Sequence, residues 1–227
     1  MARAMWKNGD IVKAKIQLER TANVAPSNPQ PIYYLGQISE DLDKPEEAME
    51  YYAKATKSSP NFLLARVATA RLFLRQGNLK QALVELTEAN NFNPRSAIVR
   101  NGLGEVYLKQ ANLRLAESEF TEALRLDSEL ASAAFNLAIA QREQEKYEEA
   151  LKSFERVKVI APRYEKLDLE HARTLYRMER YKEALQMCEE AIRHTPKEDS
   201  LYVQAGLAAK AAGELDCPFL GALPIVP

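Results

Sequence analysis

Residues 131–164 read ASAAFNLAIAQREQEKYEEALKSFERVKVIAPRY, and this stretch decides the fold. It places two small residues twelve positions apart, at Ala138 and Ala150, and such a pair recurs once in every stretch of this length. The other pairs are Gly36/Ala48, Ala70/Ala82, Gly104/Ala116 and Ala172/Ala184, and Gly206 opens a sixth. A strict period of this length is typical of stacked copies of one supersecondary unit, because a unit that cannot bury its apolar face alone buries it against its neighbours.

Each period carries further markers at fixed places. When Ala138 is counted as position 8, Phe154 falls at position 24, Val157 at 27 and Pro162 at 32. The equivalent residues in other periods are Tyr52, Leu86, Phe120 and Cys188 at position 24, Ala55, Ala89, Ala123 and Ala191 at 27, and Pro60, Pro94 and Pro196 at 32. Small residues let two helices approach closely, a large side chain fills the gap beyond them, and proline ends the second helix. In the turn between the two helices we expect Gly9, Gly77, Asn112 and Gly213 to adopt the left-handed conformation.

This pattern resembles the tetratricopeptide repeat family, whose unit is a helix, a turn and a second helix. The resemblance covers nearly all of residues 1–216. It implies an all-α fold, a right-handed α-solenoid superhelix of stacked helix-turn-helix repeats. The tryptophan that the family places near position 4 is replaced by Ile32, Arg66, Arg100, Ala134, Asp168 and Tyr202. In addition, Ser128 stands in place of one proline and His171 in place of one leucine.

The period divides the chain into segments. They are a partial N-terminal repeat at 1–28, full repeats at 29–62, 63–96, 97–130, 131–164 and 165–198, a partial repeat or capping helix at 199–216, and an apolar tail at 217–227. A solenoid needs an end with a polar outer face, which a helix at 199–212 would supply. Because Met1 falls in the middle of a first helix, we expect a piece of a longer array, a truncated product or a short genuine first helix.

The tail, CPFLGALPIVP at residues 217–227, has three prolines and no charged side chain, so it cannot form the missing second helix. Two interpretations remain open. The segment is a disordered, vector-derived or splice-derived end, or it is an apolar tail that docks on this molecule or on a neighbouring copy. The second interpretation would allow self-association.

Composition excludes several classes of partner. Hydrophobic residues make up 46% of the chain, charged residues 28%, and the net charge is −1, which gives no bulk attraction to nucleic acid or to an anionic membrane. No apolar run is long enough to cross a bilayer, and residues 1–10 do not resemble a signal peptide. We therefore expect no nucleic acid, no direct membrane insertion and a cytoplasmic location, although a chain whose leader had been removed would look the same. Cys188 holds a core position, which predicts a buried thiol.

Motifs for catalysis and metal binding are missing from the sequence. The only histidines, His171 and His194, fall on different predicted helices, whereas a helical metal site needs a pair one turn apart. Gly102-Leu103-Gly104 resembles half of a dinucleotide-binding loop, but Tyr107 stands where the third glycine belongs. No phosphate-binding loop with Gly-Lys-Ser or Gly-Lys-Thr occurs. We predict that the protein is not an enzyme and has no cofactor, catalytic residue or metal site.

In the tetratricopeptide family the first helices line a concave face, into which positions 2, 5, 6, 9, 12 and 13 point. The resemblance therefore implies a partner-binding groove made by the residues at these positions. We predict that its residues include Leu64, Val67, Arg71, Leu74, Arg75, Ile98, Asn101, Leu108, Lys109, Phe135, Asn136, Ile139, Arg142, Lys166, Arg173, Tyr176 and Arg177. Basic residues outnumber acidic ones at these positions. The alternative is that some of the apolar side chains pack between first helices instead.

The groove predicts a protein or peptide ligand with apolar anchors and acidic residues. The acidic residues are expected because Arg71, Arg75, Lys109, Arg142 and Arg173 would otherwise lack partners. The function that follows is a non-catalytic interaction scaffold or adaptor that binds a peptide or helix of another protein. The alternative is the recognition arm of a larger enzyme, transport or secretion assembly.

A third hypothesis, a heat-shock co-chaperone, fits the sequence poorly. The family's clamp for a terminal carboxylate is matched here by Asn136 and Lys166 only. Asn101 and Glu105 stand where the clamp has lysine and asparagine, and Glu170 replaces its arginine. A carboxylate ligand would meet two glutamates, which disfavours this partner.

Overall fold

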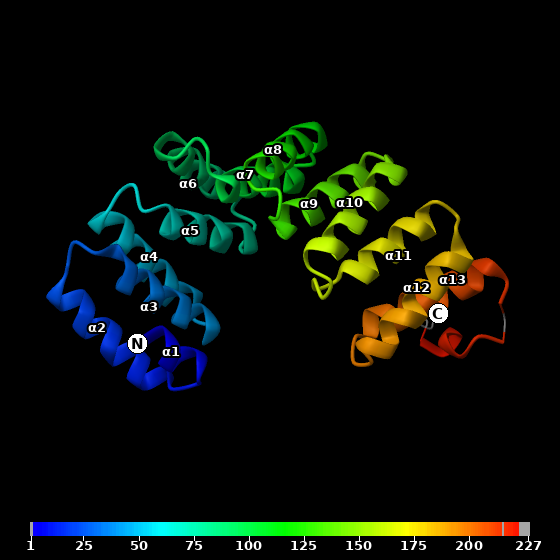
Figure 1. Ribbon diagram of the computed structural model, residues 1–227, viewed down its shortest axis with the longest axis horizontal. Helices are drawn as coiled ribbons and strands as arrows, with labels where there is room; N and C mark the ends of the chain where they lie inside the picture. The colour runs from blue at the N-terminus through cyan, green and yellow to red at the C-terminus, as the bar shows by residue number, and fades with distance from the viewer. Residues whose placement is uncertain (1, 215, 223–227) are drawn as a thin grey trace. The chain divides into compact units, whose positions relative to one another are not determined.

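The computed structural model describes residues 2–214 and 216–222, which form thirteen α-helices, one 3₁₀ helix and no strand (Figure 1). Their bounds are α1 Ala2–Lys7, α2 Ile11–Val24, α3 Pro29–Asp41, α4 Pro45–Ser58, α5 Leu63–Arg75, α6 Leu79–Phe92, α7 Ala97–Lys109, α8 Leu113–Leu126, α9 Ala131–Glu143, α10 Tyr147–Ile160, α11 Leu167–Arg177, α12 Tyr181–His194, α13 Asp199–Ala212 and η1 Pro218–Ala222. The odd-numbered helices from α3 to α13 are first helices. All but α11 begin at the first position of a predicted period. The expectation of an all-α fold of helix-turn-helix repeats is confirmed.

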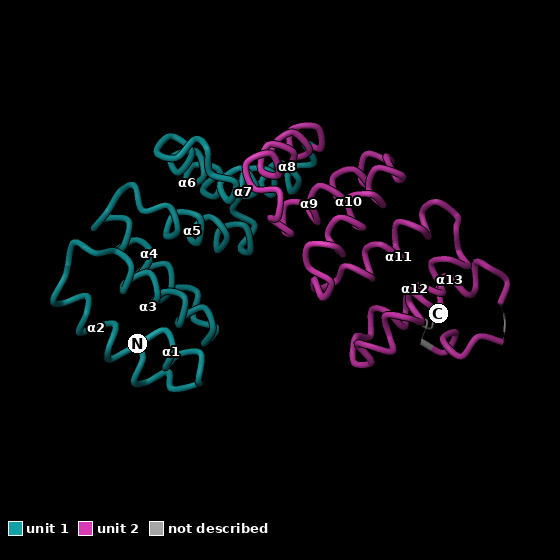
Figure 2. The backbone as a smooth tube through the Cα atoms, in the orientation of Figure 1, with its two compact units in different colours: residues 1–112 teal, residues 113–227 magenta. Residues whose placement is uncertain are grey.

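The chain divides into two compact units, residues 1–112 and 113–227 (Figure 2). The division falls in the turn between α7 and α8, inside the period 97–130. Within each unit, helices that follow one another in the sequence pack together. First helices of neighbouring periods also pack, as α5 does with α7, α9 with α11, and α11 with α13. Each unit is therefore a stack of helical hairpins.

The periodic markers form the core. Ala48, Ala82, Ala116, Ala150 and Ala184 at position 20 are fully buried. The large side chains at position 24 are buried with them, namely Tyr52, Leu86, Phe120, Phe154 and Cys188. The small residue at position 8 makes room for these side chains, because an added Cβ on Gly36 would lie 2.5 Å from Cε1 of Tyr52. The alternation of small and large residues in the sequence is thus a packing requirement.

The turn after each first helix has one backbone conformation throughout the chain. A positive φ occurs at Gly9, Asp43, Gly77, Ala111, Glu145, Glu179 and Gly213, each separated from the next by one full period. The expectation for the three glycines is confirmed. In the period 97–130 our expectation was wrong, because Ala111 and not Asn112 adopts the left-handed conformation. The repeat imposes this turn whether or not a glycine is present.

The alanine in this turn gives a stability prediction. Ala111→Gly is expected to raise the free energy of unfolding by about 0.5–1 kcal/mol, because alanine is strained at a φ of 58° and glycine is not. The reverse change, Gly77→Ala, should lower it by a similar amount. Urea denaturation of both variants measures the effect. A loss of stability in Ala111→Gly would contradict the strained turn.

The described part of the tail packs on this molecule. The helix η1 contacts α13, and Cys217, Phe219 and Leu220 lie against the core cluster of α11, α12 and α13. The ring of Phe219 lies 6.0 Å from that of Tyr202 in an edge-to-face arrangement. Residues 217–222 thus agree with the docking interpretation, while residues 223–227 lie outside the described residues. Self-association through the tail stays a prediction.

Candidate partner-binding surface

The predicted groove residues differ in how much of each side chain is exposed to solvent. The exposed ones are Leu64, Arg71, Arg75, Ile98, Lys109, Lys166, Arg173 and Arg177, all at positions 2, 9 and 13. The half-buried ones are Leu74, Leu108, Phe135, Asn136, Ile139 and Tyr176, and the buried ones are Val67, Asn101 and Arg142. Apart from Ile139, the half-buried and buried residues occupy positions 5, 6 and 12. Among the predicted groove residues, the accessible surface is therefore formed mainly by positions 2, 9 and 13 of the first helices.

Several predicted apolar anchors belong to the core. Val67 is a member of a buried cluster, and Leu74 packs against it. Phe135 packs against the core of α9 and α10, with its ring centroid 5.8 Å from Phe154 and 4.9 Å from Tyr164. Val67 and Leu74 thus belong to a cluster that joins the first helices α5 and α7, as the alternative interpretation described, whereas Phe135 packs on the second helix α10 and on Tyr164. Leu64 and Ile98, which are 36% and 43% exposed, are the accessible apolar residues of the set.

In the first unit the cations of α5 differ in their partners. Arg75 forms an ion pair with Glu40 of α3, and Glu40 also accepts a hydrogen bond from the hydroxyl of Tyr52. By contrast, Arg71, like Lys109 of α7, has no ion pair among the described residues. Of the predicted groove cations of this unit, Arg75 is therefore paired, whereas Arg71 and Lys109 are exposed and have no ion pair among the described residues.

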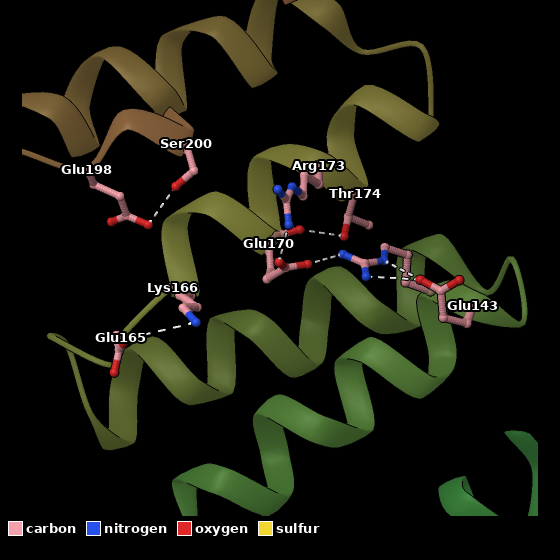
Figure 3. Close-up of polar contacts among 9 residues, drawn as sticks. Glu143, Glu165, Lys166, Glu170, Arg173, Thr174, Glu198 and Ser200 are labelled. Carbon is pink, nitrogen blue, oxygen red and sulfur yellow. Dashed lines mark hydrogen bonds and ion pairs between the residues drawn. The ribbon is translucent and has the colours of Figure 1, made fainter. Parts of the chain in front are cut away.

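In the second unit a charged network joins α9 to α11 (Figure 3). Arg142 pairs with Glu143 at 2.9 Å and also with Glu170 of α11, and the side chains of Arg142 and Glu170 are nearly buried, at 10% and 12% exposure. Glu170 also accepts from Arg173 at 2.6 Å, and Glu143 lies 3.9 Å from Arg177. Three guanidinium groups thus share two carboxylates, and the network keeps a net positive charge.

These contacts correct one part of the sequence analysis. We expected Arg75, Arg142 and Arg173 to lack partners without a ligand, but each has a carboxylate of its own chain. The pairing of these arginines with Glu40 and Glu170 was not predicted, because the partner of a long side chain depends on which residues of the neighbouring helix lie opposite it. The signal was in the sequence, since residues of opposite charge stand at positions 6, 12 and 13 of neighbouring periods. Such pairs tie adjacent first helices together.

The thiol of Cys188, which could in principle react, is part of the packed core. Cys188 is fully buried, and burial raises the pKa of its thiol to about 12, so the thiol stays protonated and unreactive. The expected buried thiol is confirmed. Residues 2–214 and 216–222 contain no group of three or more acidic, histidine or cysteine side chains placed to hold a metal ion. No described helix combines the length and the apolar character needed to span a membrane.

His171 is buried at position 7 and stacks on Phe154 at 5.7 Å. Desolvation lowers its pKa below the ordinary value of 6.5, and Lys158 and Arg180 lower it further, against the opposing effect of Glu155 and Asp168. The unfolded chain therefore binds a proton at this imidazole more readily than the folded protein does. As a result, His171 does not reduce the free energy of unfolding well above pH 6.5, and it lowers that free energy as the pH drops below 6.5.

We therefore expect His171→Leu to reduce the loss of stability between pH 7 and pH 5. Leucine occupies the equivalent place in other periods, as Leu35 and Leu103 do, so the variant should fold. Urea midpoints across this pH range measure the effect, and the exposed His194→Gln variant controls for removal of a histidine elsewhere. An unchanged pH dependence in His171→Leu would contradict the role given to its burial.

Three family profiles match the chain, and all are described as tetratricopeptide repeats. They match residues 41–105, 101–165 and 172–193, which together are more than half of the chain. Among curated protein sequences, none matches.

Solved structures agree on the fold. A tetratricopeptide repeat protein from Parabacteroides merdae is 22% identical, with a TM-score of 0.73 over 94% of this chain and 84% of that one. One chain of the crystal structure of the APC/C hetero-tetramer Cut9–Hcn1 is 14% identical, with a TM-score of 0.82 over 97% of this chain and 44% of that one. YrrB, a TPR protein with an unusual peptide-binding site, is 19% identical, with a TM-score of 0.57 over 87% of this chain and 98% of that one. The periodic core, the repeated turn and these matches agree, and the chain belongs to the tetratricopeptide repeat family.

Proposed function

We propose that this protein is a non-catalytic interaction scaffold, and that it binds a peptide or helix of a partner protein along the exposed positions of its first helices. The observation that carries the proposal is the surface of α5 and α7. There Leu64 and Ile98 are exposed, and Arg71 and Lys109 have no ion pair among the described residues. Exposed apolar side chains beside uncompensated cations are suited to a ligand that carries both apolar and acidic groups.

The spacing of the first helices sets the form of the ligand. Packed helices lie about 8–10 Å apart, and an extended chain advances about 3.3 Å per residue. An extended ligand that crosses α5 and α7 would therefore present an apolar anchor about every third residue, with acidic residues between anchors. A helical ligand would instead use the spacing i, i+3, i+4, i+7.

The experiment first identifies the partner protein and then tests whether the partner binds at the exposed residues of α5. Affinity purification with mass spectrometry identifies binding proteins, and the affinity of the purified partner is measured for Arg71→Glu. We expect the reversal to slow association and to flatten its salt dependence, because long-range attraction acts mainly on the association rate. Lys80→Glu, an exposed cation on the second helix α6, is the matched control. Binding that survives Arg71→Glu but is lost in Lys80→Glu would place the partner on the other face.

A second candidate function is the recognition arm of a larger assembly. The match to Cut9–Hcn1 favours it, since that structure is a hetero-tetramer and this chain spans less than half of the matched subunit. The two candidates differ in the partner. A single peptide-bearing protein recovered with this chain supports the adaptor, whereas a stable multi-subunit complex supports the recognition arm.

A further inference from the structure

The buried histidine of α11 stands where other periods have a leucine. His171 is at position 7, and the equivalent residues include Leu35, Leu103 and Leu137. Its side chain is only 8% exposed. The imidazole makes no hydrogen bond within the described part of the chain, since Nδ1 lies 3.9 Å from Oε1 of Glu155, which is too far. A buried polar group with no partner costs free energy unless a ligand supplies that partner.

His171 lines a cleft of about 360 Å³ that is formed by α10, α11 and α12 of the second unit. The buried Leu175 of α11 and the half-buried Leu151 and Met187 provide its apolar surface. Most of the lining belongs to the second helices α10 and α12, so the cleft is separate from the exposed positions of the first helices. Apolar walls with a few polar groups are typical of a small binding site.

The charged groups of the cleft do not balance. Three carboxylates, those of Glu155, Glu183 and Glu190, and one guanidinium, that of Arg180, line it, so its formal charge is −2 while the imidazole is neutral. Arg180 is compensated, because its Nε donates to Glu183 at 2.7 Å. Among the described residues, neither Glu155 nor Glu190 has an ion pair with a lysine or an arginine. Two carboxylates of the cleft are therefore open to a cation.

The surroundings of His171 keep its imidazole neutral at neutral pH. Desolvation lowers its pKa, and the charges around it act in both directions, with Glu155 and Lys158 on α10, Asp168 on α11 and Arg180 at the start of α12. Lys158 is not part of the lining. A neutral imidazole has one nitrogen that accepts a hydrogen bond. The cleft thus offers a buried uncharged acceptor together with exposed carboxylates.

We propose that this cleft binds an arginine side chain of a partner protein. The methylene groups of the arginine pack on Leu175 and Met187. Its guanidinium donates to the carboxylates of Glu155 and Glu190 and to the imidazole of His171. Five N–H donors in one plane serve several acceptors at once, whereas a lysine ammonium is compact and more strongly hydrated. The site is separate from the first-helix surface of the proposed function, so either proposal can fail without the other.

The test uses the full chain and a blocked peptide, acetyl-Ala-Arg-Ala-amide, with the methyl signal of Met187 followed by NMR. We expect a saturable shift of this signal, and none with the matched peptide that has uncharged citrulline in place of arginine. Glu190→Gln should raise the dissociation constant about two- to fivefold, as loss of one exposed charge pair does. Glu149→Gln removes an exposed carboxylate of α10 outside the cleft and is the matched control.

His171 provides a second readout. The affinity of the parent protein should fall between pH 7 and pH 5, because protonation of the imidazole removes the acceptor and adds a repelling charge. His171→Leu should bind about two- to fivefold more weakly at pH 7, as loss of one hydrogen bond to a charged group does, and it should lose most of this pH dependence. A histidine that serves packing alone would leave both quantities unchanged in the variant.

Several results would overturn the inference. They are no shift at millimolar peptide, equal binding of the citrulline peptide or of a lysine peptide, and unchanged affinity in both Glu190→Gln and His171→Leu. Tighter binding of free arginine than of the peptide would assign the cleft to the amino acid. Self-association that is lost in Glu190→Gln would assign it to a second copy of this chain. The scaffold function is tested separately by Arg71→Glu and stands if only this site fails.

Discussion

Phe154→Ala is expected to lower the free energy of unfolding by about 3–5 kcal/mol, the range for truncating a fully buried phenylalanine. Phe154 is completely buried in the core of α9 and α10. Its ring contacts those of Phe135 and His171, which belong to two different first helices, α9 and α11. Truncation would leave a cavity that joins two neighbouring periods, so the loss includes packing between repeats as well as within one.

Urea denaturation measures this effect, and hydrogen exchange locates it in α9, α10 and α11. Val159→Ala is the matched control, because Val159 lies on the same helix but is 82% exposed, and it should change stability by less than about 0.5 kcal/mol. A loss below about 1 kcal/mol in Phe154→Ala would mean that position 24 does not hold the core. Faster exchange confined to α10 would contradict the coupling between periods.

The sequence predicted the core well because packing repeats with the period. Position 20 needs a small residue and position 24 a large one wherever two helices meet in the same way, so Ala150 and Phe154 were identified from spacing alone. The turn was predicted less well. Ala111 adopts a conformation that the sequence suggested for Asn112, because the geometry of the repeat outweighs the preference of a single residue.

The candidate surface was predicted only in part. The period says which positions lie on the first helices, but the partner of a long charged side chain depends on the neighbouring helix. Arg142 was expected to be free, yet it lies nearly buried between Glu143 and Glu170. The late start of α11 was also missed, since Glu165 and Lys166 are residues that ordinarily continue a helix.

The second large effect concerns the close approach of α3 and α4. Gly36→Ala is expected to lower the free energy of unfolding by about 1–3 kcal/mol, because the added Cβ would lie 2.5 Å from the ring of Tyr52. That ring is fully buried and cannot move aside. The loss should exceed the gain of about 1 kcal/mol that alanine normally brings to a helix interior. Urea denaturation of the variant measures the balance.

Gly102→Ala is the matched comparison. Its Cβ would lie 2.7 Å from Cδ2 of Leu86, which is the end of a flexible side chain and can rotate. The cost of rotating the Leu86 side chain and the gain in helix propensity from alanine should then nearly cancel, and the free energy of unfolding should change by less than about 1 kcal/mol. Equal losses in the two variants would mean that the rigidity of the neighbour does not matter. Because Tyr52 donates to Glu40, which holds Arg75, only Gly36→Ala should also disturb an exposed cation of the proposed binding surface.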